Sequence, residues 1–422
     1  MSGTEIRKQA SCEDDFDPAS LPADTALARI LDSITPVSDM ERLPIRKSLG
    51  RILAGDIVSP INVPSGTNSA MDGYAIQGQD IPETGTASLQ ILGTAYAGKP
   101  WVGKLRRGQC IRIMTGAIMP DGTDTVIMQE HVELTDDCIL IGTDVKPGAN
   151  VRQAGEDIAS GDMVLTAGTY LTPAEIGFIA SLGLAEIAVF RQLKVAFFST
   201  GDELRSIGED LVEGQIYDSN RYTLYGMLAR LGVEILDMGV IRDNPEALRE
   251  GFEKASAEAD VLITSGGVSV GEADYVKEIL SEVGSVNFWK VAMKPGRPLA
   301  FGRIKQTWFF GLPGNPVSVM VTFYQFVQPA LYRLAGCRHT VPATFQVTCN
   351  SRLRKKPGRV EYQRGILQRS ETGELTVTKT GMQGSGILRS MTQANCFIIL
   401  PMDSGNIEPG MKVEVQPFFG LV

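Results

Sequence analysis

The stretch Asp260–Asp274, DVLITSGGVSVGEAD, is more informative about this chain than any other. Its apolar run Val261–Ile263 predicts a buried strand, and the two glycines that follow predict a turn where a ligand approaches backbone N–H groups. Glu272 and Asp274 then open a helix. Such a loop at the carboxyl end of a strand suits a phosphorylated ligand carried with a divalent cation. An ordinary glycine-rich β–α turn has the same pattern.

Strand and helix patterns alternate on both sides of this stretch. LKVAFFST and VEILDMGVI are strand-like and are each followed by a helical segment, the first of which begins at Asp218. A long apolar helix is expected over about residues 316–334. This alternation predicts a doubly wound α/β domain, with a parallel sheet covered by helices on both faces.

The remaining regions have other sequence patterns. Thr25–Ile34 is an isolated amphipathic helix, residues 61–151 are strand-like and turn-rich, and Thr172–Glu175 is a capping box. The last eighty or so residues hold about five β-runs, which predict a small β-barrel or sandwich. Residues 1–20 are expected to form an acidic, disordered tail without a signal core.

Composition excludes several functional classes. No apolar run approaches a membrane span, and a net charge of −9 argues against a general nucleic-acid binder. Two histidines make a His-built zinc site or a Ser-His-Asp triad improbable, and six scattered cysteines suggest free thiols in a reducing cytoplasm. Thr340–Val422 holds ten Lys/Arg and six Asp/Glu, so this part is +4 in an acidic chain. Such a domain is consistent with anion capture, although scattered surface charge is the more common cause of such a balance.

Polar loops follow the expected strands of the α/β unit. Neither a P-loop nor a GxGxxG motif occurs. If the sheet is parallel, Glu203, Asp243 and Asp274 meet at one edge and can share Mg²⁺, which prefers oxygen ligands. Lys294 and Arg297 would then neutralise phosphate charge. Each of these residues has a plainer reading as a helix cap or a solvated loop residue.

Several motifs in combination point to a family. STGDEL (199–204), TSGGVSVGEAD (264–274), KPGRP (294–298) and GLPGNPVS (311–318) follow NSAMDGYA (68–75) and MTGA (114–117). With these motifs the chain resembles the molybdopterin molybdotransferases, the MoeA family, which also provides the catalytic E domain of gephyrin. The resemblance covers about residues 21–422.

The resemblance implies an elongated protomer of four domains that forms a homodimer. On this chain the α/β molybdopterin-binding domain would be 21–40 plus 190–338, and a linking domain would be 41–60 plus 152–189. A β domain would be inserted at 61–151, and a C-terminal β-barrel would span 339–422.

The implied reaction inserts molybdate into adenylylated molybdopterin and releases AMP, with Mg²⁺ as cofactor and zinc as a possible substitute. The implied setting is cytoplasmic, without nucleic acid or membrane. Other partners would be the molybdopterin adenylyltransferase and downstream cofactor-maturation proteins. Rival interpretations are that adenylyltransferase itself and a gephyrin-like scaffold.

The resemblance also implies three sets of site residues. The catalytic set is Asp72, Thr115, Asp157, Glu203, Asp243 and Asp274, of which Glu203, Asp243 and Asp274 would also hold the metal. The substrate-binding set is Ser265, Gly266, Gly267, Lys290, Lys294, Pro295, Pro313, Pro316, Arg364 and Ser385. Asp72 and Thr115 would reach the site from the partner protomer. Arg364 and Ser385 suit a tetrahedral oxyanion, unless Arg364 pairs with Glu361 or Glu414 on the barrel surface.

Overall fold

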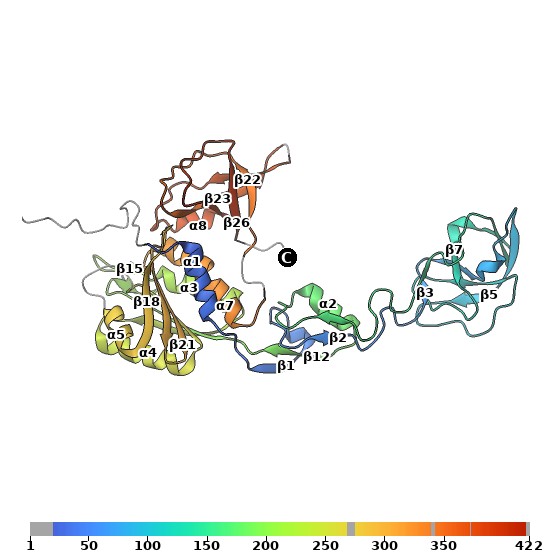
Figure 1. Cartoon of the computed structure of the whole chain (residues 1–422), viewed down its shortest axis with the longest axis horizontal. Helices are drawn as coiled ribbons and strands as arrows, with labels where there is room; N and C mark the ends of the chain where they lie inside the picture. The colour runs from blue at the N-terminus through green and yellow to red at the C-terminus, as the bar shows by residue number, and fades with distance from the viewer. Residues whose placement is uncertain (1–19, 268–274, 339–341, 372, 419–422) are drawn as a thin grey trace, which may run out of the picture.

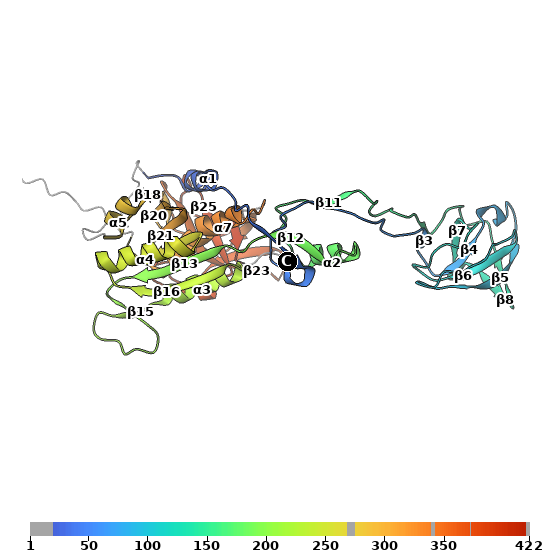
Figure 2. The same ribbon diagram turned by 90° about the horizontal axis from the view of Figure 1, so that it is seen from below.

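The computed structural model describes residues 20–267, 275–338, 342–371 and 373–418. The molecule is elongated (Figures 1 and 2). An α/β unit and a β-barrel lie together at one end, a narrow linking region occupies the middle, and a β domain lies at the other end. Within the described residues, no helix is both long and apolar enough to cross a bilayer.

A six-stranded sheet forms the centre of the α/β unit, in the order β16-β13-β17-β21-β20-β18. The strands are β13 (Lys194–Thr200), β16 (Glu234–Ile241), β17 (Val261–Ser265), β18 (Gly284–Lys290), β20 (Pro298–Ile304) and β21 (Thr307–Leu312). The first four in this order pair in parallel, whereas β20 pairs antiparallel with both of its neighbours. The sheet is therefore mixed, because the short link around Lys305 between β20 and β21 leaves no room for a crossover.

Helices cover both faces of this sheet, as expected for a doubly wound domain. One face carries α1 (Ala23–Ser33), α3 (Ser219–Arg230) and the continuous run α6 (Pro316–Thr322), η4 (Phe323–Val327, π-helical) and α7 (Gln328–Leu334). The other face carries α4 (Pro245–Glu258) and α5 (Tyr275–Val283). Phe197 and Phe198 of β13 point into opposite cores, as the two-residue period of a strand requires. Helix α1 buries Ala26 and Ile30 in the first core, so it belongs to this unit despite its distance along the chain.

Two chain segments pair along the linking region. There β1 (Met40–Pro44) pairs with β12 (Glu186–Phe190), and β2 (Ile57–Val58) with β11 (Met163–Leu165); η1 (Ile45–Lys47) follows β1. Helix α2 (Pro173–Ser181) begins at a capping box, in which Thr172 and Glu175 bond reciprocally. The capping box confirms the start of this helix expected from the sequence.

The β domain at the far end is built on a six-stranded sheet, in the order β7-β4-β6-β5-β9-β8. Its strands are β4 (Gly73–Ile76), β5 (Ala87–Ala95), β6 (Gln109–Ile113), β7 (Thr125–Met128), β8 (Glu133–Thr135) and β9 (Cys138–Ile141), with short helices η2 (Gly78–Asp80) and η3 (Gln129–His131). The paired strands β3 (Asn68–Ser69) and β10 (Val151–Arg152) join it to the linking region.

The C-terminal region is a closed five-stranded β-barrel, because β23 pairs with both β24 and β25. Its elements are β22 (Phe345–Cys349), β23 (Val360–Arg369), β24 (Leu375–Lys379), α8 (Arg389–Gln393), β25 (Cys396–Leu400) and β26 (Lys412–Pro417). The barrel is docked on the α/β unit, since β19 (Met293–Lys294) pairs with β23 and Tyr324 stacks on Phe418 at 6.0 Å.

Candidate functional site

A cleft of about 1630 Å³ lies between the carboxyl edge of the α/β sheet and the barrel. The loops after β13, β16, β17 and β21 form one side of it, because parallel strands end at a common edge. The other side comes from the barrel, and the short strands β14 (Leu204–Arg205) and β15 (Ile216–Tyr217) add to the rim. The site is thus assembled from segments that are far apart in the sequence.

The Ser265-Gly266-Gly267 turn lines the cleft as the sequence predicted. Gly266 has φ +97°, and a Cβ atom there would lie 2.5 Å from the Thr200 carbonyl oxygen. Its N–H donates to the Leu312 oxygen at 3.1 Å. This N–H is therefore already bonded, and ligand contact with the backbone of the Ser265-Gly266-Gly267 turn stays a prediction. Here glycine is required by the close packing of three strand ends.

Two carboxylates of the expected metal set, Glu203 and Asp243, line the cleft. Burial raises the pKa of Asp243, and the neighbouring Asp202 and Glu203 carboxylates raise it further. A bound cation would relieve this repulsion, and oxygen donors suit a hard ion such as Mg²⁺. No group of three or more His, Cys, Asp or Glu side chains suited to a metal occurs among the described residues. Asp274, the third expected ligand, lies outside them.

Cations line the cleft from both sides. Lys294 ends β19, and Pro295 and Arg297 follow in the loop before β20; all three line the cleft. The barrel adds a basic segment, 352–359, that the sequence analysis did not single out. Its cations at the cleft are Arg352, Arg354, Lys355, Lys356 and Arg359. Five cations within RLRKKPGR are a readable signal, but only the fold shows that they face the carboxylates.

The GLPGNP loop connects the two sides of the cleft. Pro313 and Pro316 line it, and Asn315 donates from Nδ2 to Ser385 Oγ at 3.2 Å. The N–H of Val317 donates to the backbone oxygen of Ser385 at 3.1 Å. The predicted substrate-binding Ser385 is therefore held at the cleft by the start of α6.

Arg364 lies in β23 and is only 1% exposed. Its guanidinium donates to Ser390 Oγ at 3.1 Å, to Gly384 O at 3.3 Å and to Tyr362 O at 3.4 Å. Burial lowers the pKa of Arg364 to about 10. Neither of the two surface pairings weighed for it, with Glu361 or Glu414, occurs among the ion pairs of the described residues.

Arg364 lines a second cavity of about 620 Å³ rather than the main cleft. The two cavities share Lys294, Pro295, Arg354, Glu361 and Gln383 in their walls. Arg364 is therefore next to the cleft but separated from its main volume. Its contact with Gly384 places it beside the segment that carries Ser385.

Four other expected site residues do not line the cleft of the described protomer. Asp72 and Thr115 lie in the far β domain, where Asp72 Oδ1 accepts from the Thr115 N–H at 2.7 Å and from its hydroxyl at 2.8 Å. These bonds lower the pKa of Asp72. Asp157 lies between β10 and β11, and Lys290 ends β18.

Among the polar side chains of the cleft wall that the sequence analysis missed are Thr200, Asp218 and Asn220. Asp218 was recognised only as the start of a helix, and Thr200 only as the end of a strand. A helix cap and a ligand-binding residue look alike in sequence, so no signal separated the two roles.

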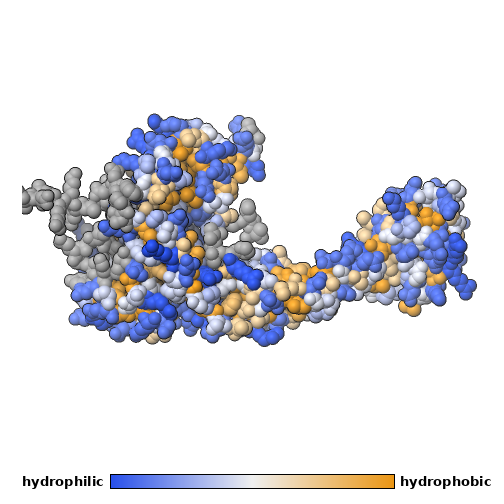
Figure 3. Space-filling view, in the orientation of Figure 1, coloured by the Kyte–Doolittle hydropathy of each residue, from blue (hydrophilic) through white to orange (hydrophobic). Residues whose placement is uncertain are grey.

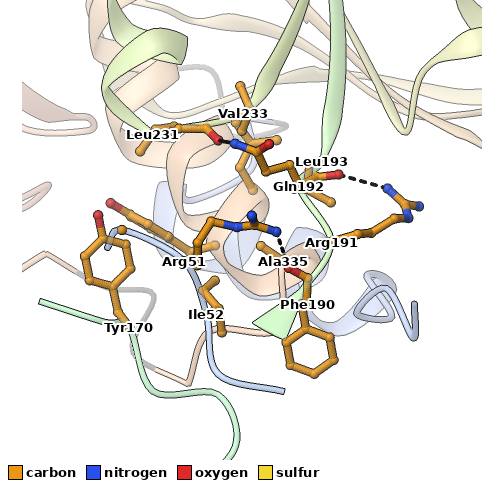
Figure 4. A pocket seen from close by; sticks show the side chains of 14 residues that line it. Arg51, Ile52, Tyr170, Phe190, Arg191, Gln192, Leu193, Leu231, Val233 and Ala335 are labelled. Carbon is orange, nitrogen blue, oxygen red and sulfur yellow. Dashed lines mark hydrogen bonds between the residues drawn. The ribbon is translucent and has the colours of Figure 1, made fainter. Parts of the chain in front are cut away.

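A small cavity of about 40 Å³ lies where the linking region meets the α/β unit (Figure 4). It contains none of the expected site residues. Arg51 donates to the Phe190 oxygen at 2.7 Å, and Arg191 forms a bidentate pair with Asp260 at 2.7 and 2.8 Å. The Arg191–Asp260 pair holds the linking region against the α/β unit, and the Arg51 bond ties two segments of the linking region together, so this cavity is a structural joint.

Three family models together cover most of the chain. Residues 21–183 match the MoeA N-terminal region (domain I and II), and residues 196–333 match a probable molybdopterin binding domain. Residues 346–418 match the MoeA C-terminal region (domain IV).

Individual relatives extend over nearly the whole chain. A molybdopterin molybdenumtransferase of Haemophilus influenzae is 45% identical, over 95% of this chain and 100% of the relative. Gephyrin of Dictyostelium discoideum is 35% identical, over 93% of this chain and 61% of that protein. The crystal structure of a molybdopterin biosynthesis MoeA protein from Pyrococcus horikoshii has a TM-score of 0.82 at 30% identity, over 94% of this chain and 100% of that one.

Proposed function

This chain belongs to the MoeA family of molybdopterin molybdenumtransferases, and on that premise we propose that it inserts molybdate into adenylylated molybdopterin and releases AMP. The observation that carries the proposal is the cleft itself. It places Glu203 and Asp243 on the α/β side opposite the basic segment 352–359 of the barrel. A nucleotide-linked phosphate and an oxyanion both require this surplus of positive charge beside carboxylates.

The residues of the cleft act chiefly by positioning and by neutralising charge. Lys294, Arg297 and the basic segment 352–359 offset the negative charge of the phosphoanhydride. Arg364, in the wall of the second cavity, and Ser385, in the wall of the main cleft, hold the molybdate, and Lys294 lines both cavities. This arrangement brings the oxyanion and the pterin-bearing substrate together at the boundary of two domains.

The donor set of the cleft suits Mg²⁺ better than zinc. Glu203 and Asp243 would hold the ion, and no histidine lies among the described residues of the cleft wall. When bound, Mg²⁺ would stabilise the negative charge of the phosphate oxygens.

We further propose that the active form is a homodimer. The paired Asp72 and Thr115 lie at the far end of the protomer from the cleft, so they can complete only a partner's site. Apolar side chains gather on the surface of the linking region (Figure 3). Met40, Leu49, Val58 and Met163 are at least half exposed there, which is typical of a surface that is covered in an assembly.

The compartment and the neighbouring steps follow from the same chemistry. Five described cysteines are free thiols, which suits the cytoplasm. The adenylylated substrate must come from a molybdopterin adenylyltransferase, and the product must pass to proteins that mature molybdoenzymes.

Cofactor reconstitution tests the proposal directly. Purified protein is mixed with adenylylated molybdopterin, molybdate and Mg²⁺, and the product is assayed by AMP release and by activation of an apo-molybdoenzyme. We expect both signals to require all components. AMP release without activation would refute the transfer of molybdate, and ATP consumption on free molybdopterin would instead indicate the adenylyltransferase.

A further inference from the structure

Three residues on one side of the cleft have a buried oxygen that no described donor reaches. The atoms are Oγ1 of Thr200, at the end of β13, and Oδ2 of Asp218 and Oδ1 of Asn220, at the start of α3. The residues are 5%, 2% and 9% exposed, and all three line the cleft. Buried acceptors without donors are uncommon in folded proteins, so each calls for an explanation.

Structural roles account for only part of these side chains. Asp218 Oδ1 accepts from the Arg221 N–H at 3.1 Å and caps α3, and Asn220 Nδ2 donates to the Gly314 oxygen at 2.7 Å. Among the described residues, the other oxygen of Asp218 and the amide oxygen of Asn220 accept no hydrogen bond, and Thr200 Oγ1 has no hydrogen-bond partner. Helix α3 packs against β13, so the three acceptors belong to adjacent elements. Acceptors without a donor match a ligand edge that carries only N–H groups.

We propose that Thr200, Asp218 and Asn220 form the subsite that recognises the pterin ring of the substrate. This inference rests on the proposed function. The 2-amino-4-oxopyrimidine edge of a pterin offers three N–H hydrogens, two from the amino group and one from the ring nitrogen. The adenine amino group offers two, beside ring nitrogens that are acceptors. Three acceptors therefore match the pterin edge and would leave one oxygen unmatched by adenine.

The proposed contact is compatible with the burial of these oxygens. The terminal torsion of an aspartate is broad, so an N–H donor can draw Oδ2 toward the cleft. A site whose acceptors are otherwise unsatisfied strongly rejects an analogue that lacks the donor. The subsite would therefore determine specificity as well as affinity.

Two threonines provide a matched test. Thr200 and Thr264 lie on the adjacent strands β13 and β17, and each has a buried Oγ1 without a described donor, but only Thr200 lines the cleft. Thr200→Val and Thr264→Val remove the same kind of hydroxyl. Asp218→Asn removes the charged acceptor, while asparagine remains as good an N-cap as aspartate.

The full-length variants are titrated with pterin-6-carboxylate and with lumazine-6-carboxylate, in which a carbonyl replaces the 2-amino group. AMP and IMP form the corresponding nucleotide pair. We expect wild-type protein to prefer the pterin by about tenfold or more. Thr200→Val should weaken pterin binding by about tenfold and Asp218→Asn by about a hundredfold. Thr264→Val should stay within about twofold, and AMP binding should be unchanged in all variants.

Three results would overturn the subsite. The first is equal pterin affinity of the Thr200→Val and Thr264→Val proteins. The second is no preference of the wild type for pterin over lumazine. The third is weaker binding of AMP, but not of IMP, by Asp218→Asn than by the wild type, which would assign the acceptors to adenine. If Asp218→Asn unfolds, the threonine pair decides alone. Reconstitution of the same wild-type preparation separates the two proposals, because a pterin preference without cofactor synthesis would refute the function and leave the subsite standing.

Discussion

Replacement of Arg364 by methionine should cost activity but little stability. Arg364 is 1% exposed, and none of the ion pairs among the described residues joins it to a carboxylate. Burial lowers the pKa of Arg364 to about 10, and this fall corresponds to roughly 3 kcal/mol against keeping the charge buried. Since the pKa of Arg364 is lowered in the folded protein, the free-energy cost of burying its charge is present at neutral pH. It disappears only in strong alkali, where the arginine is neutral in the unfolded chain as well. Methionine carries no charge, so the Arg364→Met variant does not have this cost.

The hydrogen bonds of Arg364 offset much of this gain. The two at 3.3 and 3.4 Å are long, and the bond to Ser390 Oγ at 3.1 Å is ordinary, so together they contribute roughly 2–3 kcal/mol. The free energy of unfolding of Arg364→Met should therefore lie within about 1 kcal/mol of the wild type. The molybdate concentration at half-maximal rate should rise about a hundredfold, as expected when a charged hydrogen-bond donor to an oxyanion is lost.

Urea denaturation and reconstitution across a molybdate series measure the two effects. Arg369→Met is the control, because Arg369 lies exposed on the same strand and donates to the Gly373 oxygen at 3.0 Å. It should change neither quantity. A loss of several kcal/mol in Arg364→Met with an unchanged molybdate dependence would show that the arginine is structural, and would refute the oxyanion role.

Three further predictions concern other parts of the molecule. A mixture of Asp72→Asn and Asp243→Asn proteins should recover up to about a quarter of wild-type activity, because about half of randomly paired dimers are heterodimers and each heterodimer has one intact site of two. If neither the mixture nor cross-linked heterodimers recover activity, the site is not shared between protomers. Because the pKa of Asp243 is raised, Mg²⁺ affinity by calorimetry should begin to fall at a higher pH than for an ordinary aspartate, and Asp202→Asn should move that pH downward. The ionised form is disfavoured in the folded protein, so the contribution of Asp243 to the free energy of unfolding should rise as pH falls through this range. Gly266→Ala should destabilise by about 2–3 kcal/mol because its Cβ would meet a carbonyl oxygen at 2.5 Å, whereas Gly314→Ala, with nothing nearer than 4.0 Å, should change the denaturation midpoint little.

Local patterns predicted much of the α/β unit. The apolar run before Ser265 is strand β17, and the capping box at Thr172 begins α2. Both follow from rules that act within a few residues, namely strand burial and helix capping. The antiparallel placement of β20 was missed because a strand has the same apolar pattern whichever neighbour it pairs with.

The candidate site was predictable only where a motif marked it. Glu203, Asp243, Lys294 and Pro313 were named from loops at strand ends, and the fold brings all four to one cleft. The basic segment 352–359 had a visible charge pattern, but its position opposite the carboxylates depends on how the barrel docks.

The family, the alternation of strands and helices, and the carboxylates and cations available for the chemistry could all be predicted from the sequence alone. These properties reside in residue identity and short-range spacing. Only the tertiary structure decided that Arg364 is buried beside a second cavity, that the Gly266 N–H is already bonded, and that Thr200 and Asp218 have unsatisfied acceptors at the cleft. Burial and hydrogen-bond satisfaction depend on which distant segments pack against a residue, and no local pattern encodes those contacts.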